Sequence, residues 1–396
     1  MENGGFILLD FELSAEQKEM QKLAHDFAVE KIRPVAAYYD ETEEFPWDVV
    51  REAHKIGLTT YQYPEEYGGG GISDPVTGLL ISEELAWGCA GIQTSITGSG
   101  LAGQGILATG TEEQKKKYIG YLCDASELHL GAMGLTEPDA GSDVSSMRTT
   151  AVRDGDSWVL NGTKQFITHG GIADLHVIFA QTEPGSGWKG IECFVIEKGT
   201  PGLTMGRKEK KLGVRASHTA QVVLEECRIP LENRLSGLDG NPKGISGGLG
   251  CLMMLERTRP AVGAAALGVA RAAYEYALDY AKTRVAFGHK IIANQGISFK
   301  LADMATEIDA ARLLVWRAGW MQGQGKNAGL QASMAKLFAG DTAMRVTEEA
   351  VQILGGNGYI REYPVEKWMR DAKIFKIWEG TAEIQRLVIS RTIAGR

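Results

Sequence analysis

The segment Trp158-Val-Leu-Asn-Gly-Thr-Lys-Gln-Phe-Ile-Thr168 decides the fold class, because it carries a strand pattern in a chain that is helical on either side of it. The dipeptide Asn161-Gly162 between apolar and β-branched residues is typical of a hairpin turn. Further apolar runs bounded by turn residues follow at 175–180, 191–196 and 220–224. Because no helical pattern alternates with these runs, the sequence predicts a mostly antiparallel β domain and not a βαβ sheet.

Helical periodicity lies on both sides of the strands. The first helix is expected after Ser14, which forms a capping box with Gln17. The same periodicity predicts further helices at 44–58, 77–90 and 112–122 before the strands, and at 261–284, 295–322, 330–354 and 382–393 after them. Four long helices joined by short connections predict a bundle at the C-terminal end.

These patterns predict an α+β protein with several domains. The chain has 396 residues, more than the roughly 250 to 300 at which one hydrophobic core stops growing. The expected domains are an N-terminal helical domain at 1–128, a middle antiparallel, β-barrel-like domain at 129–242 and a C-terminal four-helix bundle at 243–396. With 44% hydrophobic and 23% charged residues, the composition is that of a globular protein, neither disordered nor fibrous.

Charge and cysteine usage exclude several classes of protein. The 42 basic and 50 acidic residues give a net charge of −8, which argues against a nucleic acid partner. The five cysteines are odd in number and never spaced CxxC, so we expect a reducing compartment and no disulfide framework.

The first ten residues resemble neither a signal nor a transit peptide, so we expect no membrane insertion. The protein is expected in a bacterial cytoplasm or, as a processed form, in the mitochondrial matrix.

The glycine motif Gly98-Ser-Gly-Leu-Ala-Gly103 matches the GxGxxG pattern of dinucleotide-binding turns. That turn works only between a strand and a helix, and here helical sequence precedes it. We therefore interpret these glycines as sites of close packing between helices. No HExxH, paired Cys/His set or GxSxG elbow occurs, so the sequence predicts neither a metal site nor a serine nucleophile.

Several ordered motifs along nearly the whole chain resemble the acyl-CoA dehydrogenase family. The motifs are Pro64-Glu-Glu-Tyr-Gly-Gly69, Leu135-Thr-Glu-Pro138 with Gly141-Ser-Asp143, Asn161-Gly162 with Lys164, Arg284 with Phe287-Gly288, Gln352-Ile-Leu-Gly-Gly-Asn-Gly358, Arg370-Asp-Ala-Lys373 and Glu379-Gly-Thr381. The resemblance implies an FAD enzyme whose cofactor lies between the β domain and the bundle. It also implies α,β-dehydrogenation of an acyl-CoA thioester to the trans-2-enoyl-CoA.

By this resemblance, Glu379 is the base that abstracts the proton α to the thioester carbonyl, while the β hydrogen leaves as hydride to the flavin. An α proton is weakly acidic, so the carboxylate must act together with hydrogen bonds to the thioester oxygen. In the family those donors are the backbone N–H of the base and a ribityl hydroxyl of the flavin. A desolvated pocket would raise the pKa of Glu379 toward neutrality and suit it to this task.

The resemblance also assigns residues to the cofactor and the substrate. The residues expected at FAD are Met133, Leu135, Thr136, Ser142, Phe166, Thr168, Arg284, Phe287, Gln295, Gln352, Gly355, Gly356, Thr381 and Glu383. Those expected at the substrate are Ser142, Glu256, Thr258, Arg259 and Gly380. Many relatives carry Trp at the position of Phe166 and Gln at that of Glu383. Some branches of the family place their base at the position of Thr258, and Glu256, about 200° around a helix from it, should face away.

The implied partners are an acyl-CoA substrate, electron-transfer flavoprotein as electron acceptor, and further copies of the chain in a homotetramer that shares FAD contacts across subunits. The stretch 91–103, which in the family lies near the acyl chain, has no charged residue, so we expect a neutral aliphatic acyl group. The alternatives are an acyl-CoA oxidase, a nitroalkane-oxidase-like flavoenzyme, which would carry Asp at the base position, and a non-catalytic scaffold with the same fold.

Overall fold

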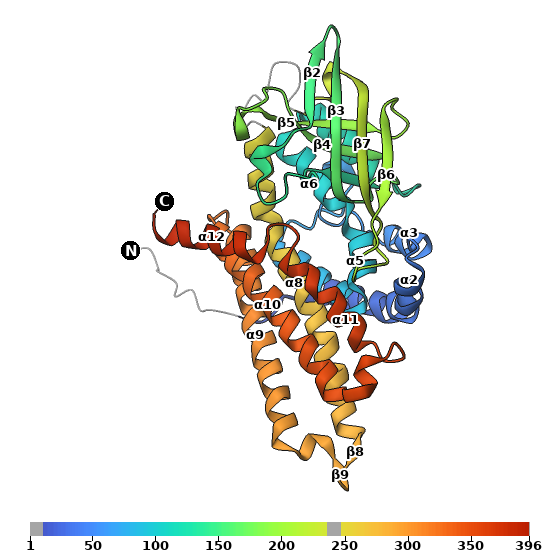
Figure 1. Cartoon of the computed structure of the whole chain (residues 1–396), viewed down its shortest axis with the longest axis vertical. Helices are drawn as coiled ribbons and strands as arrows, with labels where there is room; N and C mark the ends of the chain where they lie inside the picture. The colour runs from blue at the N-terminus through green and yellow to red at the C-terminus, as the bar shows by residue number, and fades with distance from the viewer. Residues whose placement is uncertain (1–10, 236–246, 396) are drawn as a thin grey trace.

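A computed structural model of the chain describes residues 11–235 and 247–395. A β-sheet lies at one end of the molecule, long helices form the other end, and the N-terminal helices pack between and beside them (Figure 1). The α-helices are α1 (Ala15–Phe27), α2 (Ala36–Thr42), α3 (Trp47–Lys55), α4 (Pro75–Gly88), α5 (Ala90–Thr97), α6 (Ser99–Thr109), α7 (Glu112–Leu122), α8 (Gly247–Thr283), α9 (Gln295–Gly323), α10 (Gly329–Leu354), α11 (Val365–Ala372) and α12 (Ala382–Ile393). The strands are β1 (Gly131–Gly134), β2 (Thr150–Asp154), β3 (Ser157–Thr168), β4 (Leu175–Gln181), β5 (Ile191–Glu197), β6 (Leu203–Lys208), β7 (Thr219–Pro230), β8 (Val285–Ala286) and β9 (His289–Lys290).

The N-terminal helices begin as the sequence predicts. Ser14 caps α1, and the capping box with Gln17 is present in both directions, which confirms that prediction. The motif at 98–103 lies where α5 meets α6 and continues into α6. A Cβ atom on Gly103 would lie 2.2 Å from the hydroxyl oxygen of Tyr63, so this glycine permits close packing and forms no phosphate turn.

The strands of the middle region form one curled sheet in the order β1-β4-β2-β3-β7-β6, with β5 also paired to β4. The pairs β2/β3, β3/β7, β6/β7 and β4/β5 are antiparallel, and only β1 and one end of β2 run parallel to β4. The prediction of a mostly antiparallel domain is therefore confirmed.

The predicted hairpin turn at Asn161-Gly162 is wrong. Strand β3 runs unbroken through both residues, and the turn lies earlier, at Gly155-Asp156, between β2 and β3. Gly162 instead sits at a β-bulge, where a Cβ atom would lie 2.4 Å from the hydroxyl oxygen of Thr149. A bulge, like a turn, selects for a residue without a side chain, which explains why the local signal was misleading.

The C-terminal helices gather around α10, which packs against α8, α9, α11 and α12. Helix α8 starts at Gly247, well before the predicted residue 261, and passes through Pro260. Proline cannot donate the hydrogen bond that the carbonyl of Glu256 would otherwise accept. The side-chain amide of Gln322 approaches that carbonyl oxygen at 3.4 Å, which partly compensates for the missing donor. Helix α11 was not anticipated from periodicity.

Three further expectations concern the domain boundaries, membrane insertion and the cysteines. The predicted boundary at 242/243 and the first ten residues lie outside the described part of the chain. None of the described helices combines the length and the apolar character needed to cross a membrane. All five cysteines are free and buried.

Candidate active site

The loop that carries Glu379 joins the 3-10 turn Lys373–Lys376 to α12. Thr381 caps α12 by accepting a hydrogen bond from the N–H of Ile384 at 3.2 Å. Immediately before the cap, Glu379 and Gly380 both have left-handed backbones, with φ angles of 49° and 92°. A left-handed conformation is unfavourable for a residue with a side chain, so the surrounding contacts must hold Glu379 in place.

The carboxylate of Glu379 points toward helix α8. The hydroxyl of Thr258 donates to its Oε2 at 2.7 Å, which joins two residues that lie 121 positions apart in the sequence. Burial raises the pKa of Glu379, while the Thr258 hydrogen bond and the charges of Lys336 and Arg259 partly lower it. The net effect is a carboxyl group with a raised pKa on a left-handed turn, which suits a general base at neutral pH.

Arg259 and Glu256 lie on the same helix but have different surroundings. Arg259 is buried, and its Nη1 donates to the hydroxyl of Ser333 at 3.2 Å. Its buried Nε has no hydrogen-bond partner among the described residues, which leaves a donor free near the base. Glu256 is exposed and lies over the start of α10, where a Cβ atom on Gly329 would be 3.3 Å from its carboxyl carbon.

The β domain contributes a second surface. The bulge in β3 between Lys164 and Ile167 turns Phe166 away from the sheet, with φ 61° and 62% of the residue exposed. A bulge re-aims a side chain in this way without ending the strand. Thr168, at the end of the same strand, is half-buried. The ring of Phe166 therefore offers an open aromatic face.

The segment after β1 is anchored by a buried ion pair. The ammonium of Lys164 contacts the carboxylate of Glu137 at 2.7 Å and the carbonyl of Leu135 at 3.2 Å. The N–H of Gln165 donates to the carbonyl of Thr136 at 2.8 Å. The residues 135–136 are thereby fixed beside β3. Met133, at the end of β1, is half-buried and Ser142 is exposed.

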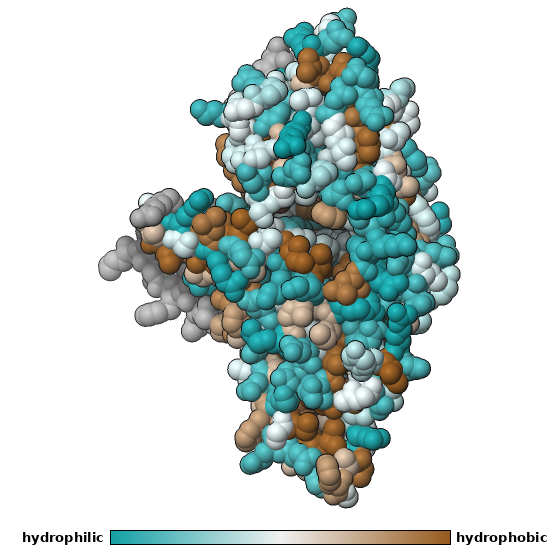
Figure 2. Space-filling view, viewed as in Figure 1, coloured by the Kyte–Doolittle hydropathy of each residue, from teal (hydrophilic) through white to brown (hydrophobic). Residues whose placement is uncertain are grey.

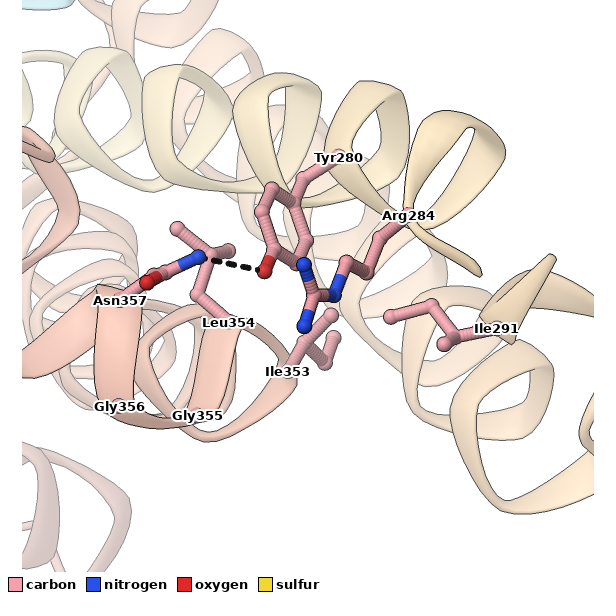
Figure 3. A pocket seen from close by; sticks show the side chains of 8 residues that line it. All are labelled: Tyr280, Arg284, Ile291, Ile353, Leu354, Gly355, Gly356 and Asn357. Carbon is pink, nitrogen blue, oxygen red and sulfur yellow. Dashed lines mark hydrogen bonds between the residues drawn. The ribbon is translucent and has the colours of Figure 1, made fainter. Parts of the chain in front are cut away.

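Three of the residues expected at FAD, Arg284, Gly355 and Gly356, help to line a cavity of about 410 Å³ at the far end of the helical domain (Figure 3). Figure 3 shows the guanidinium of Arg284 beside the hydroxyl of Tyr280, which accepts a hydrogen bond from the side-chain amide of Asn357 at 2.9 Å. The cavity is lined by Tyr280, Arg284, Ile291, Ile353, Leu354, Gly355, Gly356 and Asn357. Nothing lies within 4 Å of a Cβ atom built on Gly355 or Gly356, so the glycines leave this space open.

The structure thus places predicted residues in three groups: around the turn of Glu379, on the β domain as described above, and at the distant cavity. Glu379, Gly380, Thr258 and Arg259 gather between α8 and the loop before α12, whereas Arg284, Gly355 and Gly356 share the distant cavity. The others expected near the cavity, Phe287, Gln295 and Gln352, are exposed and do not line it. Glu383 is exposed in the first turn of α12.

Sequence reasoning missed two residues that contact the base loop. The ammonium of Lys336 donates to the carbonyl of Gly380 at 2.6 Å, and the side-chain amide of Gln385 donates to the same oxygen at 3.0 Å. A signal for Lys336 was available. It lies on the face of α10 that also carries Ala332, Ala339 and Ala343, where a lysine at a position reserved for small buried residues is unusual.

Family models match three successive parts of the chain. The acyl-CoA dehydrogenase N-terminal domain matches residues 14–126, the middle domain matches 132–227 and the C-terminal domain matches 248–394.

Individual relatives cover nearly the whole chain. An acyl-CoA dehydrogenase of Bacillus subtilis is 46% identical over 97% of this chain and 99% of its own length. The structure of butyryl-CoA dehydrogenase from Megasphaera elsdenii is 42% identical, with a TM-score of 0.92 over 98% of this chain and 100% of its own. A chain solved in work on the electron transferring flavoprotein of Acidaminococcus fermentans and flavin-based electron bifurcation is 40% identical, with a TM-score of 0.92 over 97% of this chain and 99% of its own.

Proposed function

Because the chain belongs to the acyl-CoA dehydrogenase family, we propose that it oxidises a short, neutral acyl-CoA to the trans-2-enoyl-CoA. We further propose that it passes the electrons to an electron-transfer flavoprotein. Its class is that of an oxidoreductase, and the cofactor of the family is FAD. The short acyl chain is supported by the likeness to butyryl-CoA dehydrogenase, and the acceptor by the likeness to the chain from the Acidaminococcus work.

The residues present fit FAD. The open face of Phe166 suits stacking on a flavin ring, and the fixed backbone at 135–136 lies beside the same strand. At the distant cavity, Arg284 supplies a cation for a pyrophosphate, and the bare Gly355 and Gly356 let a ligand approach the backbone. When bound, FAD accepts the β hydrogen of the substrate as hydride.

In this proposal, Glu379 takes the α proton. The observation that carries the assignment is a half-buried carboxylate with a raised pKa, which lies on a left-handed turn and accepts a hydrogen bond from Thr258. The peptide N–H of Glu379 donates to no acceptor among the described residues, so it is free to donate to the thioester oxygen. A carboxylate oxygen of Glu379 thus accepts the α proton of the substrate. The peptide N–H of the same residue stabilises the negative charge that develops on the thioester oxygen.

We expect Glu379→Gln to fold and retain FAD but to slow flavin reduction by an acyl-CoA by about 10²- to 10⁴-fold. The amide preserves the shape of the side chain and removes its basicity. The measurement is anaerobic bleaching of the bound flavin with thioesters of graded chain length. Glu113→Gln, which changes an exposed carboxylate on α7, is the matched control and should change the rate little.

Reduction of Glu379→Gln at the wild-type rate would overturn the assignment of the base. A colourless wild-type protein that takes up no FAD would favour a scaffold, and a yellow protein whose reduced flavin is reoxidised rapidly by air would favour an oxidase. A nitroalkane oxidase is disfavoured because this chain has Glu, not Asp, at position 379.

The charge of the acyl chain is a separate prediction. The polar side chains of α5 are already engaged, since Thr94 and Ser95 donate to carbonyls of their own helix at 2.8 and 3.1 Å and Gln93 donates to Thr97 at 3.0 Å. No cation on the segment 91–103 can pair with a buried carboxylate, whose unpaired burial is costly. We therefore expect kcat/KM for glutaryl-CoA to be at least about a hundredfold below that for pentanoyl-CoA. A preference for glutaryl-CoA would instead indicate an arginine that reaches the acyl chain from another element.

A further inference from the structure

A buried lysine lies directly behind the loop that carries the proposed base. Lys336 is only 1% exposed on α10, and its ammonium donates to the carbonyl oxygen of Gly380 at 2.6 Å. Burial of an ammonium group is unfavourable unless its charge is compensated. The proton transfer proposed above does not use this cation, so its presence requires a different explanation.

The lysine completes a clamp on a strained turn. The carbonyl oxygen of Gly380 also accepts from the side-chain amide of Gln385, which in addition approaches the carbonyl of Glu379 at 3.4 Å. Two successive left-handed residues would relax if these carbonyls were released. Helix α10 stays close enough to support the loop because a Cβ atom on Gly340 would lie 2.9 Å from the carbonyl oxygen of Phe375.

The charge of the lysine acts on the same carboxylate. Burial raises the pKa of Glu379, and Lys336 and Arg259 are the cations that lower it. Around the lysine, burial lowers its pKa to about 8, while Glu379, Asp341 and Glu383 oppose that change and Arg259 adds to it. The ammonium is therefore still charged at neutral pH, beside a carboxylate that must ionise in order to act.

We propose that Lys336 is a positioning residue for Glu379, which fixes the left-handed turn through the carbonyl of Gly380 and favours the ionised carboxylate by its charge. The inference rests on the proposed role of Glu379 as the base. By this inference, α10 contributes to catalysis through the loop that carries Glu379, and not through a contact with the substrate or the cofactor.

The test replaces Lys336 by Met, which has similar length but neither donor nor charge. We expect Lys336→Met to retain FAD, with flavin reduction at saturating butyryl-CoA slowed about tenfold to a hundredfold. Loss of the cation raises the pKa of Glu379, so the midpoint of the rising limb of the pH–rate profile should move to higher pH. KM should change little, because Lys336 is expected to contact the loop and not the thioester.

Two further variants sharpen the result. Lys336→Arg keeps a charged donor and should restore part of the rate and return the midpoint toward that of the wild type. Lys326→Met removes an exposed lysine just before the same helix and should leave both quantities unchanged. If Lys336→Met does not retain FAD, Lys336→Gln, which keeps a donor but no charge, replaces it and should show the same shift of the midpoint.

An unchanged midpoint in the neutral variants would overturn the proposal, even if the rate fell, because loss of packing alone does not change the pKa of Glu379. A second readout separates this inference from the proposed function. The carboxyl band that infrared difference spectra of the FAD-loaded protein lose in Glu379→Gln reports the ionisation of Glu379 without turnover. If no acyl-CoA reduces the wild type, the proposed function fails, and the shift of this band in Lys336→Met still decides the inference.

Discussion

At Glu379, burial and three favourable contacts act in opposite directions on one carboxyl group. Burial raises its pKa, and the Thr258 hydrogen bond, Lys336 and Arg259 limit the rise. A base must be ionised to accept a proton, so its pKa sets the lower end of the active pH range. If Glu379 is the base, as proposed, the contacts around it determine where that range begins.

We expect Thr258→Val to move the midpoint of the pH–rate profile upward by about one pH unit, because a hydrogen bond to a charged group contributes about 1.5 kcal/mol or more and one unit corresponds to about 1.4 kcal/mol. The sign follows from the direction of the contact, which lowers the pKa of Glu379 in the wild type. Anaerobic flavin reduction followed between about pH 5 and 9 measures this midpoint.

Thr283→Val is the matched control for this change. Thr283 lies on the same helix and is exposed, and its hydroxyl donates to the carbonyl of Asp279 at 3.0 Å, far from the base. A midpoint that moves equally in both variants, or in neither, would argue that the hydroxyl of Thr258 does not act on Glu379.

At this scale, only the motifs that resemble a family predicted Glu379 as the base and Thr258 as a residue near the substrate. Thr258 was expected near the substrate, and the structure places its hydroxyl on Glu379. The small residues around Lys336 on α10 indicate that this lysine is buried, but no sequence pattern predicts its contact with the loop or that of Gln385. These contacts depend on how closely α10 and α12 approach the loop, and no local pattern encodes that distance.

Among the elements, helix α6 can pack closely against Tyr63 because Gly103 has no side chain. Its closest approach is at Gly103, where a Cβ atom would overlap the ring and hydroxyl of Tyr63, and that hydroxyl already donates to the carbonyl of Ser99 at 3.0 Å. Tyr63 is buried and cannot move without disturbing this hydrogen bond. The helix and the turn that holds Tyr63 are thus locked together.

We expect Gly103→Ala to lower the free energy of unfolding by about 1 to 3 kcal/mol, because the methyl group overpacks a buried contact. Thermal unfolding followed by circular dichroism measures it. Gly120→Ala in α7 is the control, since the nearest atom to its Cβ is 3.9 Å away, and it should be neutral or stabilise the helix by up to about 1 kcal/mol. Equal effects of the two substitutions would contradict this account of α6.

The sequence predicted helices and strands correctly where a residue pattern is typical of only one local structure. The capping box at Ser14 is an example, since it satisfies backbone donors that every helix start leaves unpaired. Prediction failed at Gly162, where a bulge and a turn favour the same residue, and at Pro260, where a long helix tolerates a proline. In both cases the deciding contact comes from a distant segment, Thr149 or Gln322.

At the scale of the whole molecule, the described chain leaves the tip of its helical domain uncovered. The hairpin β8–β9 projects from this end (Figure 1), and hydrophobic residues reach the surface there (Figure 2). Phe287, at the turn of the hairpin, is 95% exposed and has a φ of 53°. A large, fully exposed aromatic beside the cavity of Arg284 is expected of a surface that meets another subunit.

We expect light scattering to show that the protein is a homotetramer.

We also expect Arg284→Ala to weaken FAD retention by about 10- to 100-fold, because a charged hydrogen bond to a phosphate contributes about 1.5 to 3 kcal/mol. The rate of reduction per bound flavin should change far less, since Arg284 is remote from Glu379. The measurement is the flavin content after gel filtration at decreasing protein concentration. Arg153→Ala, at an exposed position on β2, is the control, and a monomer that holds FAD tightly would contradict the shared site.

Because all five thiols are buried, we expect the native chain to react slowly with maleimide dyes. Only the thiolate reacts, and burial raises the pKa of Cys123 and Cys251 to about 12. One cysteine introduced at the exposed turn residue Asp156 therefore becomes a unique attachment point for a fluorophore. Copies that carry donor and acceptor dyes can then report subunit exchange by energy transfer, without removal of any native cysteine.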